Sequence, residues 1–267
     1  MFQGRFSMPL NSSLAKAARV VAWLCLQTAS SEPVLYAEDA ATHPLPVILL
    51  TGFEPFGAGR PPNPSWEGIK NLDGKVWRGY RLVCRQLPVV WGTPLPQLAK
   101  AIDELHPIAI FAFGQGKGYA IETVAENRRE DIRDNLGEQP GQREIVPGGP
   151  AQLSASIDAK TFANRLADQG HPVRISTEAG GYLCEETLYA LEYLRQARAP
   201  EMSVMFCHVP SLDSGMETPS SVQEFVQGVL LAWIDGKNQI AERTETDPRD
   251  QEVRRFIEAY FRTWSAG

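Results

Sequence analysis

The chain is poor in the side chains that most often carry chemistry. Its 267 residues include only four cysteines and four histidines, and none of these has the spacing of a metal-ligand motif. The formal net charge is −6 and the sequence contains no sustained basic patch, which argues against nucleic acid as a partner. No internal repeat occurs. The glycine-rich run 114–118 lacks the spacing and the Lys-Ser/Thr pair of a phosphate-binding loop.

The composition is that of a globular protein, with 43% hydrophobic and 22% charged residues. Strands are predicted near residues 46–51, 81–90, 108–113, 172–176 and 203–209, and helices near 95–105, 158–169, 184–197 and 219–235. This alternation predicts an α/β fold, a three-layer α/β/α sandwich around a mixed, mostly parallel twisted sheet. The region 127–157, rich in Gly, Pro, Gln and charge, is interpreted as a long functional loop over the site.

Two end segments lie outside this pattern. In residues 1–45, Lys16 and Arg19 precede the apolar run 20–26, a layout similar to a short signal peptide. The run is too short to span a bilayer, and an amphipathic helix or a mis-assigned start codon explains it nearly as well. Residues 237–267 carry apolar side chains at helical spacing. They predict an added amphipathic helix that packs on the domain or on another subunit.

Cys184 has the surroundings of a nucleophile. It follows the glycine-containing hinge 178–181, which comes after the β-prone segment 172–176, and it precedes leucines at helical spacing. Cys184 is therefore predicted on the first turn of a helix at a strand–turn–helix junction. Unpaired backbone N–H groups and the positive end of the helix dipole would stabilise a thiolate there.

Candidate partners for this cysteine follow two apolar strands. His208 ends the strand 204–207, a place where polar residues tend to line the ligand crevice of α/β sheets; a hydrogen bond to a loop explains its position about equally well. Glu122 lies among apolar residues after the strand 108–113, where a carboxylate is costly unless paired. A catalytic imidazole needs such an acidic orienting group, although Glu122 alone is more often an ordinary surface acid. The remaining histidines lie in turns or in the N-terminal segment: His43, His106 and His171.

Several short motifs follow one another along residues 46–236. They are Thr51–Gly57, Asn63-Pro-Ser65, Gly114-Gln115, Asp134-Asn135 with Gly137, Gly148–Pro150, Ala179-Gly180 with Cys184, and Phe206 with His208–Pro210. In this order they resemble pyroglutamyl peptidase I, the pyrrolidone-carboxylate cysteine peptidases. The resemblance implies a catalytic domain over 46–236 that removes N-terminal pyroglutamyl residues from peptides, without a cofactor or metal. It assigns Cys184 as nucleophile, His208 as general base and then acid, and Glu122 as the group that orients the imidazole.

The substrate also constrains the site, because pyroglutamate is a small flat lactam that needs an aromatic slot with polar ends. Phe53 and Phe56 lie in a loop directly after the strand 47–50, where two exposed aromatic rings would be unusual. They either pack back on the core or cover a ligand, and the resemblance implies that they clasp the lactam ring. It implies four further pocket residues: Gln115, Ile132, Tyr182 and Leu183. An ordinary N-terminal ammonium would lose its hydration in such a slot, which disfavours it.

The resemblance carries two further expectations. Members of the family form homo-oligomers and act in the cytoplasm, so we expect both of this chain. Export to the periplasm or the medium is the alternative if residues 1–45 act as a signal peptide.

Four positions depart from the family pattern: Tyr119 in a shortened loop before Glu122, Thr123 and Asp131 where arginines are usual, and Glu185 where asparagine usually follows the nucleophile. Negative charge from Glu185 and Glu186 beside Cys184 should disfavour its thiolate, although nearby Arg128, Arg129 and Arg133 could compensate for the missing arginine. The alternative is therefore a divergent member that binds a peptide end, or cleaves another N-acyl amide, with little pyroglutamyl activity.

Overall fold

The structure of the protein, a computed structural model, describes residues 44–212, 215 and 217–246. The predictions made for residues 1–43 and 247–267 lie outside this range. Within it, no helix is long and apolar enough to cross a membrane.

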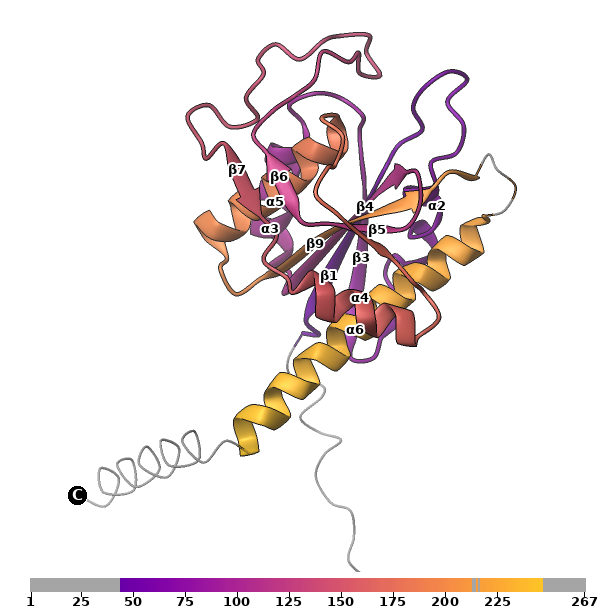
Figure 1. Cartoon of the computed structure of the whole chain (residues 1–267), viewed down its shortest axis with the longest axis vertical. Coiled ribbons are helices and arrows are strands. Elements are labelled where there is room, and N and C mark those ends of the chain that lie inside the picture. Colours follow the sequence, from indigo (N-terminus) through magenta and orange to yellow (C-terminus); the bar gives the residue numbers. More distant parts are fainter. Residues whose placement is uncertain (1–43, 213–214, 216, 247–267) are drawn as a thin grey trace, which may run out of the picture. The chain divides into compact units, whose positions relative to one another are not determined.

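A seven-stranded sheet forms the centre of the fold (Figure 1), in the order β2-β3-β1-β4-β9-β5-β8. Its strands are β1 (Val47–Phe53), β2 (Val76–Trp77), β3 (Tyr80–Leu87), β4 (Ala109–Gly116), β5 (Ala120–Glu122), β8 (Arg174–Ser176) and β9 (Ser203–Pro210). Neighbours pair in parallel except β2 with β3 and β5 with β9. A separate antiparallel pair joins β6 (Val124–Glu126) to β7 (Gln152–Ser154). The sheet is mixed and mostly parallel, as predicted.

Helices cover both faces of the sheet. They are α2 (Pro64–Glu67), α3 (Pro94–Leu105), α4 (Ala159–Asp168), α5 (Leu183–Arg198) and α6 (Pro219–Thr246), with a 3-10 turn at Lys70–Leu72. Figure 1 shows α3 and α5 on one face and α4 and α6 on the other. Each face has its own apolar core: Leu98 and Leu188 belong to the first, Phe162 and Phe225 to the second. The predicted three-layer α/β/α architecture is confirmed.

The central strand β1 is buried along its whole length and is longer than the sequence pattern predicts. All seven residues of Val47–Phe53 are buried, as expected of a parallel strand covered by helices on both faces. The strand continues to Phe53, which is 3% exposed. The loop therefore begins after Phe53, and not after residue 51 as the sequence predicts. Phe53 is therefore a core residue as well as a candidate pocket residue.

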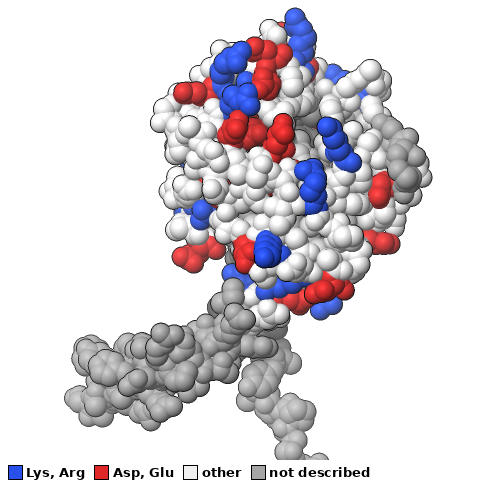
Figure 2. Space-filling view, viewed as in Figure 1, with Lys and Arg blue, Asp and Glu red and all other residues white. Residues whose placement is uncertain are grey.

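Charged side chains of both signs are mixed over the described part of the visible face (Figure 2), without a continuous basic surface. This distribution agrees with the net charge of −6. It gives no electrostatic footprint for nucleic acid on that face.

Candidate active site

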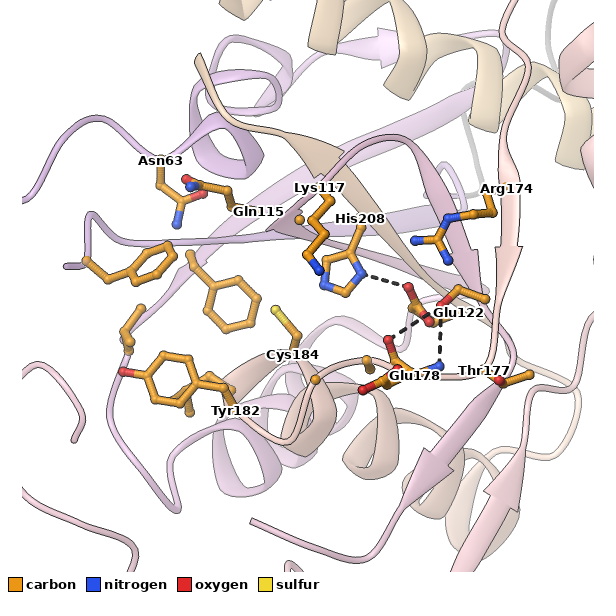
Figure 3. A pocket seen from close by; sticks show the side chains of 18 of the residues that line it. Asn63, Gln115, Lys117, Glu122, Arg174, Thr177, Glu178, Tyr182, Cys184 and His208 are labelled. Atoms are coloured by element: carbon orange, nitrogen blue, oxygen red, sulfur yellow. Dashed lines mark hydrogen bonds and ion pairs between the residues drawn. The ribbon is translucent and has the colours of Figure 1, made fainter. Parts of the chain in front are cut away.

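A cavity of about 690 Å³ opens where β1, β4 and β9 end and α5 begins. Ligands of open α/β sheets bind at such carboxyl ends. Its walls come from segments far apart in the sequence: Phe53, Phe56, Asn63, Val89, Gln115–Lys117, Glu122, Arg174–Gly180, Tyr182–Cys184 and His208. All three predicted catalytic side chains thus line one cavity (Figure 3).

Cys184 is the second residue of α5, whose N-cap is Tyr182. The two glycines before the cap, Gly180 and Gly181, have φ of 95° and 66°, a left-handed backbone that turns the chain from β8 into the helix. The first N–H groups of a helix have no intrahelical acceptor. These N–H groups and the positive end of the helix dipole lie at the end of α5 that carries the half-buried Cys184.

His208 and Glu122 form a buried pair on adjacent antiparallel strands. Nδ1 of His208 lies 2.7 Å from Oε1 of Glu122, and the residues are 8% and 1% exposed. Nε2 is therefore the ring nitrogen that remains for Cys184, which lines the same cavity. Oε2 of Glu122 has no hydrogen-bond partner among the described residues. Within the same part of the chain, no group of three or more His, Cys, Asp or Glu side chains could hold a metal ion.

The charge state of His208 follows from these contacts. Burial by itself lowers the pKa of a histidine, but the hydrogen bonds and charges of Cys184 and Glu122 act in the opposite direction and raise the pKa of His208 to about 10. At neutral pH the ring is then an imidazolium between two acidic side chains. Such a ring stabilises an anionic sulfur and holds the proton that a departing amine needs.

Two glycines of β4 make room for this arrangement. A methyl group on Gly114 would lie 2.7 Å from Sγ of Cys184, and one on Gly116 would lie 2.7 Å from Cγ of His208. Both distances are shorter than real Cβ contacts allow. The β4 backbone therefore forms the floor on which the sulfur and the imidazole rest.

Most of the residues that were expected to hold the lactam lie together. Phe53, Phe56, Gln115, Tyr182 and Leu183 all line the cavity. The ring of Phe56 lies 6.4 Å from that of Tyr182, tilted by 49°. These side chains form an aromatic end with an amide beside it.

Ile132 was expected in the same wall, and the structure does not bring it there. It is not among the residues that line the cavity. Its carbonyl accepts a hydrogen bond of 2.8 Å from the Trp91 indole, while its side chain is exposed at 43%. The indole ring packs edge-on against Tyr182 at 5.1 Å, so the Trp91 indole, and not the Ile132 side chain, contacts the aromatic end.

Other motif residues hold the loops around the cavity. Oε1 of Glu54 accepts from the Val89 amide at 2.9 Å and from Nδ2 of Asn135 at 2.7 Å. Asn63 caps α2 by accepting from Ser65, whose hydroxyl in turn accepts from the Phe53 amide. Glu54 of the first motif and Asn135 of the Asp-Asn motif thus connect the loops around the cavity. The spacing of the motifs alone did not indicate this structural role.

The four departures from the family pattern lie outside the cavity lining. Tyr119 donates to Glu217 and packs on Phe225 at 4.4 Å. The Thr123 hydroxyl donates to the Ser176 carbonyl. Asp131 forms an exposed ion pair with Arg143. The remaining departure, Glu185, belongs to the first turn of α5.

The two acids beside Cys184 are both engaged away from the sulfur. Glu185 accepts from the backbone amide of Glu126 at 2.6 Å, and burial raises the pKa of its carboxyl although this bond opposes the shift. Glu186 is fully buried and forms a two-point ion pair with Arg129 at 2.8 and 2.9 Å. Of the three arginines suggested as compensation, Arg129 is the one that neutralises an acid next to the nucleophile.

Sequence reasoning missed several residues of the cavity. Val89, Asn63 and Lys117 come from loops, and Arg174–Gly180 come from β8 and the turn after it. Lys117 lies in the glycine-rich run 114–118 that follows the predicted strand 108–113, and Arg174 lies within the predicted strand 172–176. The place of Lys117 just after a strand was a signal for the site, whereas nothing in the sequence marked Arg174.

Comparisons with known proteins show the family. A family profile described as pyroglutamyl peptidase matches residues 47–233. The pyrrolidone-carboxylate peptidase of Yersinia pestis (strain Pestoides F) is 37% identical over 190 residues, covering 69% of this chain and 88% of the relative. That of Yersinia pseudotuberculosis serotype O:3 (strain YPIII) is 36% identical over the same coverage.

Solved structures give the same result. Pyroglutamyl peptidase I from Bacillus amyloliquefaciens superposes with a TM-score of 0.65 at 29% identity, over 71% of this chain and 95% of that one. Pyrrolidone carboxyl peptidase from Thermococcus litoralis has a TM-score of 0.67 over 73% and 96% of the two chains; at 23% identity it supports the fold alone. The family match covers well over half of the sequence. The chain therefore belongs to the pyroglutamyl peptidase family of cysteine-type omega peptidases.

Proposed function

We propose that this protein hydrolyses the amide bond after an N-terminal pyroglutamyl residue, with Cys184 as nucleophile, His208 as proton carrier and Glu122 as the group that orients His208. The observation that carries the proposal is the single cavity in which Cys184, His208 and Glu122 lie beside an aromatic end. The 2.7 Å contact between Nδ1 and Oε1 engages one ring nitrogen of His208 and leaves Nε2 to exchange protons with the sulfur and the substrate.

The chemical steps follow from this placement. The Cys184 thiolate attacks the pyroglutamyl carbonyl carbon, and the electron pair moves to the carbonyl oxygen. Backbone N–H groups at the start of α5 are positioned to stabilise that oxyanion. The His208 imidazolium gives its proton to the leaving amine as the C–N bond breaks. Water, deprotonated by the now neutral His208, then hydrolyses the thioester and releases pyroglutamate.

Selectivity for the lactam follows from what the aromatic end lacks. The rings of Phe53, Phe56 and Tyr182 offer contacts to the apolar ring edge, and Gln115 offers an amide to its polar edge. An N-terminal ammonium placed there would lose its hydration without gaining a carboxylate partner, since Glu122 is already paired with His208. A neutral lactam avoids this cost.

Hydrolysis of pyroglutamyl-7-amino-4-methylcoumarin by purified protein under reducing conditions tests the proposal. Turnover should be lost in Cys184→Ala and in His208→Ala, and should persist in the matched control Cys84→Ala, whose thiol is buried against the Ile69 carbonyl. No turnover by the folded wild type would overturn the proposal. It would favour a divergent member that acts on another N-acyl amide, which a panel of acyl-coumarin amides would then identify.

A further inference from the structure

The cavity continues beyond the catalytic side chains. In Figure 3, Asn63, Gln115 and Tyr182 lie on one side of Cys184 and His208, and Arg174, Thr177 and Glu178 lie on the other. A volume of about 690 Å³ is in the range of sites for ligands much larger than one five-membered ring. If the lactam occupies the aromatic end, as the proposed function requires, the leaving peptide must extend toward Arg174.

Two cationic side chains of the cavity have no acidic partner among the described residues: Arg174 at this second end, and Lys117, which Figure 3 shows between Gln115 and His208. Lys117 and Arg174 both line the cavity and are exposed. Among the described residues, no carboxylate oxygen lies within 4.0 Å of either side-chain cation, and neither forms a side-chain hydrogen bond. In contrast, Arg128, Arg129 and Arg143 of the region 127–157 all form ion pairs. Lys117 and Arg174 are thus available for a ligand.

The sheet register places Arg174 at a suitable distance from the reaction. Ala120 of β5 pairs with His208 on one side and with Arg174 on the other. Residues paired across a sheet point to the same face, so Arg174 projects to the face that carries His208. Strands are about 4.8 Å apart, which puts the Arg174 backbone roughly 10 Å from that of His208. An extended substrate peptide covers this span in about three residues. The long Arg174 side chain can extend toward His208, so that a group nearer to the scissile bond is also within reach.

We propose that Arg174 and Lys117 bind a carboxylate on the leaving side of the substrate, so that the preferred substrates are short pyroglutamyl peptides with a negative charge within the first residues after the lactam. This inference rests on the proposed function. Glu178, at the same end, opposes it by repulsion, but its side chain is exposed to solvent. Glu122 is neutralised by His208, which leaves two cations against one screened carboxylate.

The carboxylate has two possible sources, an acidic side chain or the C-terminus of a dipeptide, and paired substrates distinguish them. Pyroglutamyl-Glu-amide is compared with pyroglutamyl-Gln-amide, and pyroglutamyl-Ala with a free carboxylate is compared with pyroglutamyl-Ala-amide. For each pair the ratio of kcat/KM values is measured in wild type, Arg174→Gln, Lys117→Gln and the control Lys160→Gln. Lys160 is exposed on α4, outside the cavity. Because each ratio is taken within one variant, a general loss of activity cancels.

We expect wild type and Lys160→Gln to prefer the charged member of at least one pair by about three- to tenfold at low ionic strength, and less at high salt. The ratio should fall toward one in Arg174→Gln and in Lys117→Gln. Preference in the first pair alone assigns an acidic side chain, and preference in the second alone assigns the C-terminal carboxylate. Equal rates within both pairs in an enzyme that hydrolyses the neutral amides would overturn this inference and leave the proposed function standing; no turnover of any of the four substrates would overturn both.

Discussion

Gly114 shows how a residue without a side chain can matter for catalysis. A Cβ at this position would lie 2.7 Å from Sγ of Cys184 and 2.8 Å from Cζ of Phe206. In Gly114→Ala we expect the sulfur to be displaced and kcat/KM to fall by about 100-fold, since a shift of about 1 Å has effects of that size. Gly118→Ala is the matched control, because its Cβ would meet nothing within 4 Å and its φ is not positive. Full activity of Gly114→Ala would show that Sγ is not held against β4.

The protonation of His208 gives a prediction about stability. Its pKa is raised to about 10 in the folded protein, whereas an unfolded histidine titrates near 6.5. Between these pH values the folded state binds more protons than the unfolded state. The stabilisation that protonated His208 gives the folded state is therefore complete below about pH 6.5 and is lost as the pH rises toward 10. The free energy of unfolding should therefore fall by up to about 1.4 kcal/mol per pH unit.

Urea unfolding of wild type and His208→Gln at several pH values isolates this contribution. The comparison is cleanest below pH 9.0, the ordinary value for thiols, because burial also raises the pKa of the Cys84 and Cys207 thiols. We expect the slope in wild type and its absence in the variant. Parallel curves for the two proteins would mean that His208 is neutral in the folded state.

At the scale of elements, the first turn of α5 is held by one buried ion pair. Arg129 donates to both Glu186 oxygens and also to the carbonyls of Gln142 and Glu144. Glu186 accepts in addition from the Gly92 amide. The pair therefore joins the helix that carries Cys184 to two loops.

Arg129→Met should leave a fully buried carboxylate without its cation, which costs about 3–5 kcal/mol. Denaturant unfolding measures this loss. The matched control is Arg128→Met, which removes an exposed arginine that pairs with Glu126 and Glu130 and should change stability little. Equal destabilisation by both substitutions would contradict a special role for the buried pair.

The long helices and long strands could be predicted from sequence, as could the short β8 within the predicted strand 172–176, whereas α2 and the other short strands could not. The helices α3 and α4 have clear amphipathic spacing, and β1 and β9 are continuous apolar runs. In contrast β5, β6 and β7 have three residues each, too few to show a period. β5 forms where the longer β9 offers it a paired edge, and β6 and β7 pair with each other across a long sequence separation.

At the scale of the molecule, the three cysteines of the described residues lie in two kinds of environment. Burial, followed by the charge of Asp73, raises the pKa of Cys84 to about 12, and burial also raises that of Cys207. Cys184 instead lines the cavity beside His208. With iodoacetamide at pH 7 we expect Cys184 to be alkylated at least about 100-fold faster than the other two, as measured by peptide mapping. In urea the rates should converge, whereas equally slow labelling of the folded protein would count against a reactive Cys184.

The triad could be proposed from sequence because each member follows a recognisable strand or hinge, but its assembly could not. Glu122 and His208 are 86 positions apart and meet only through the antiparallel pairing of β5 with β9. The wrong prediction for Ile132 has the same cause, because the position of Ile132 depends on a tertiary contact, the hydrogen bond from Trp91 to its carbonyl. Lys117 and Arg174 also became neighbours of the site only once the sheet register was known.

The most direct test of the account is inactivation by pyroglutamyl chloromethyl ketone, followed by peptide mapping, with acetyl-prolyl chloromethyl ketone as the matched reagent. It asks at once whether Cys184 is the nucleophile and whether the aromatic end recognises the lactam. We expect loss of activity with one label per chain, on Cys184, much faster with the pyroglutamyl reagent. Labelling of Cys84 or Cys207 instead, or equal rates with the two reagents, would contradict the account.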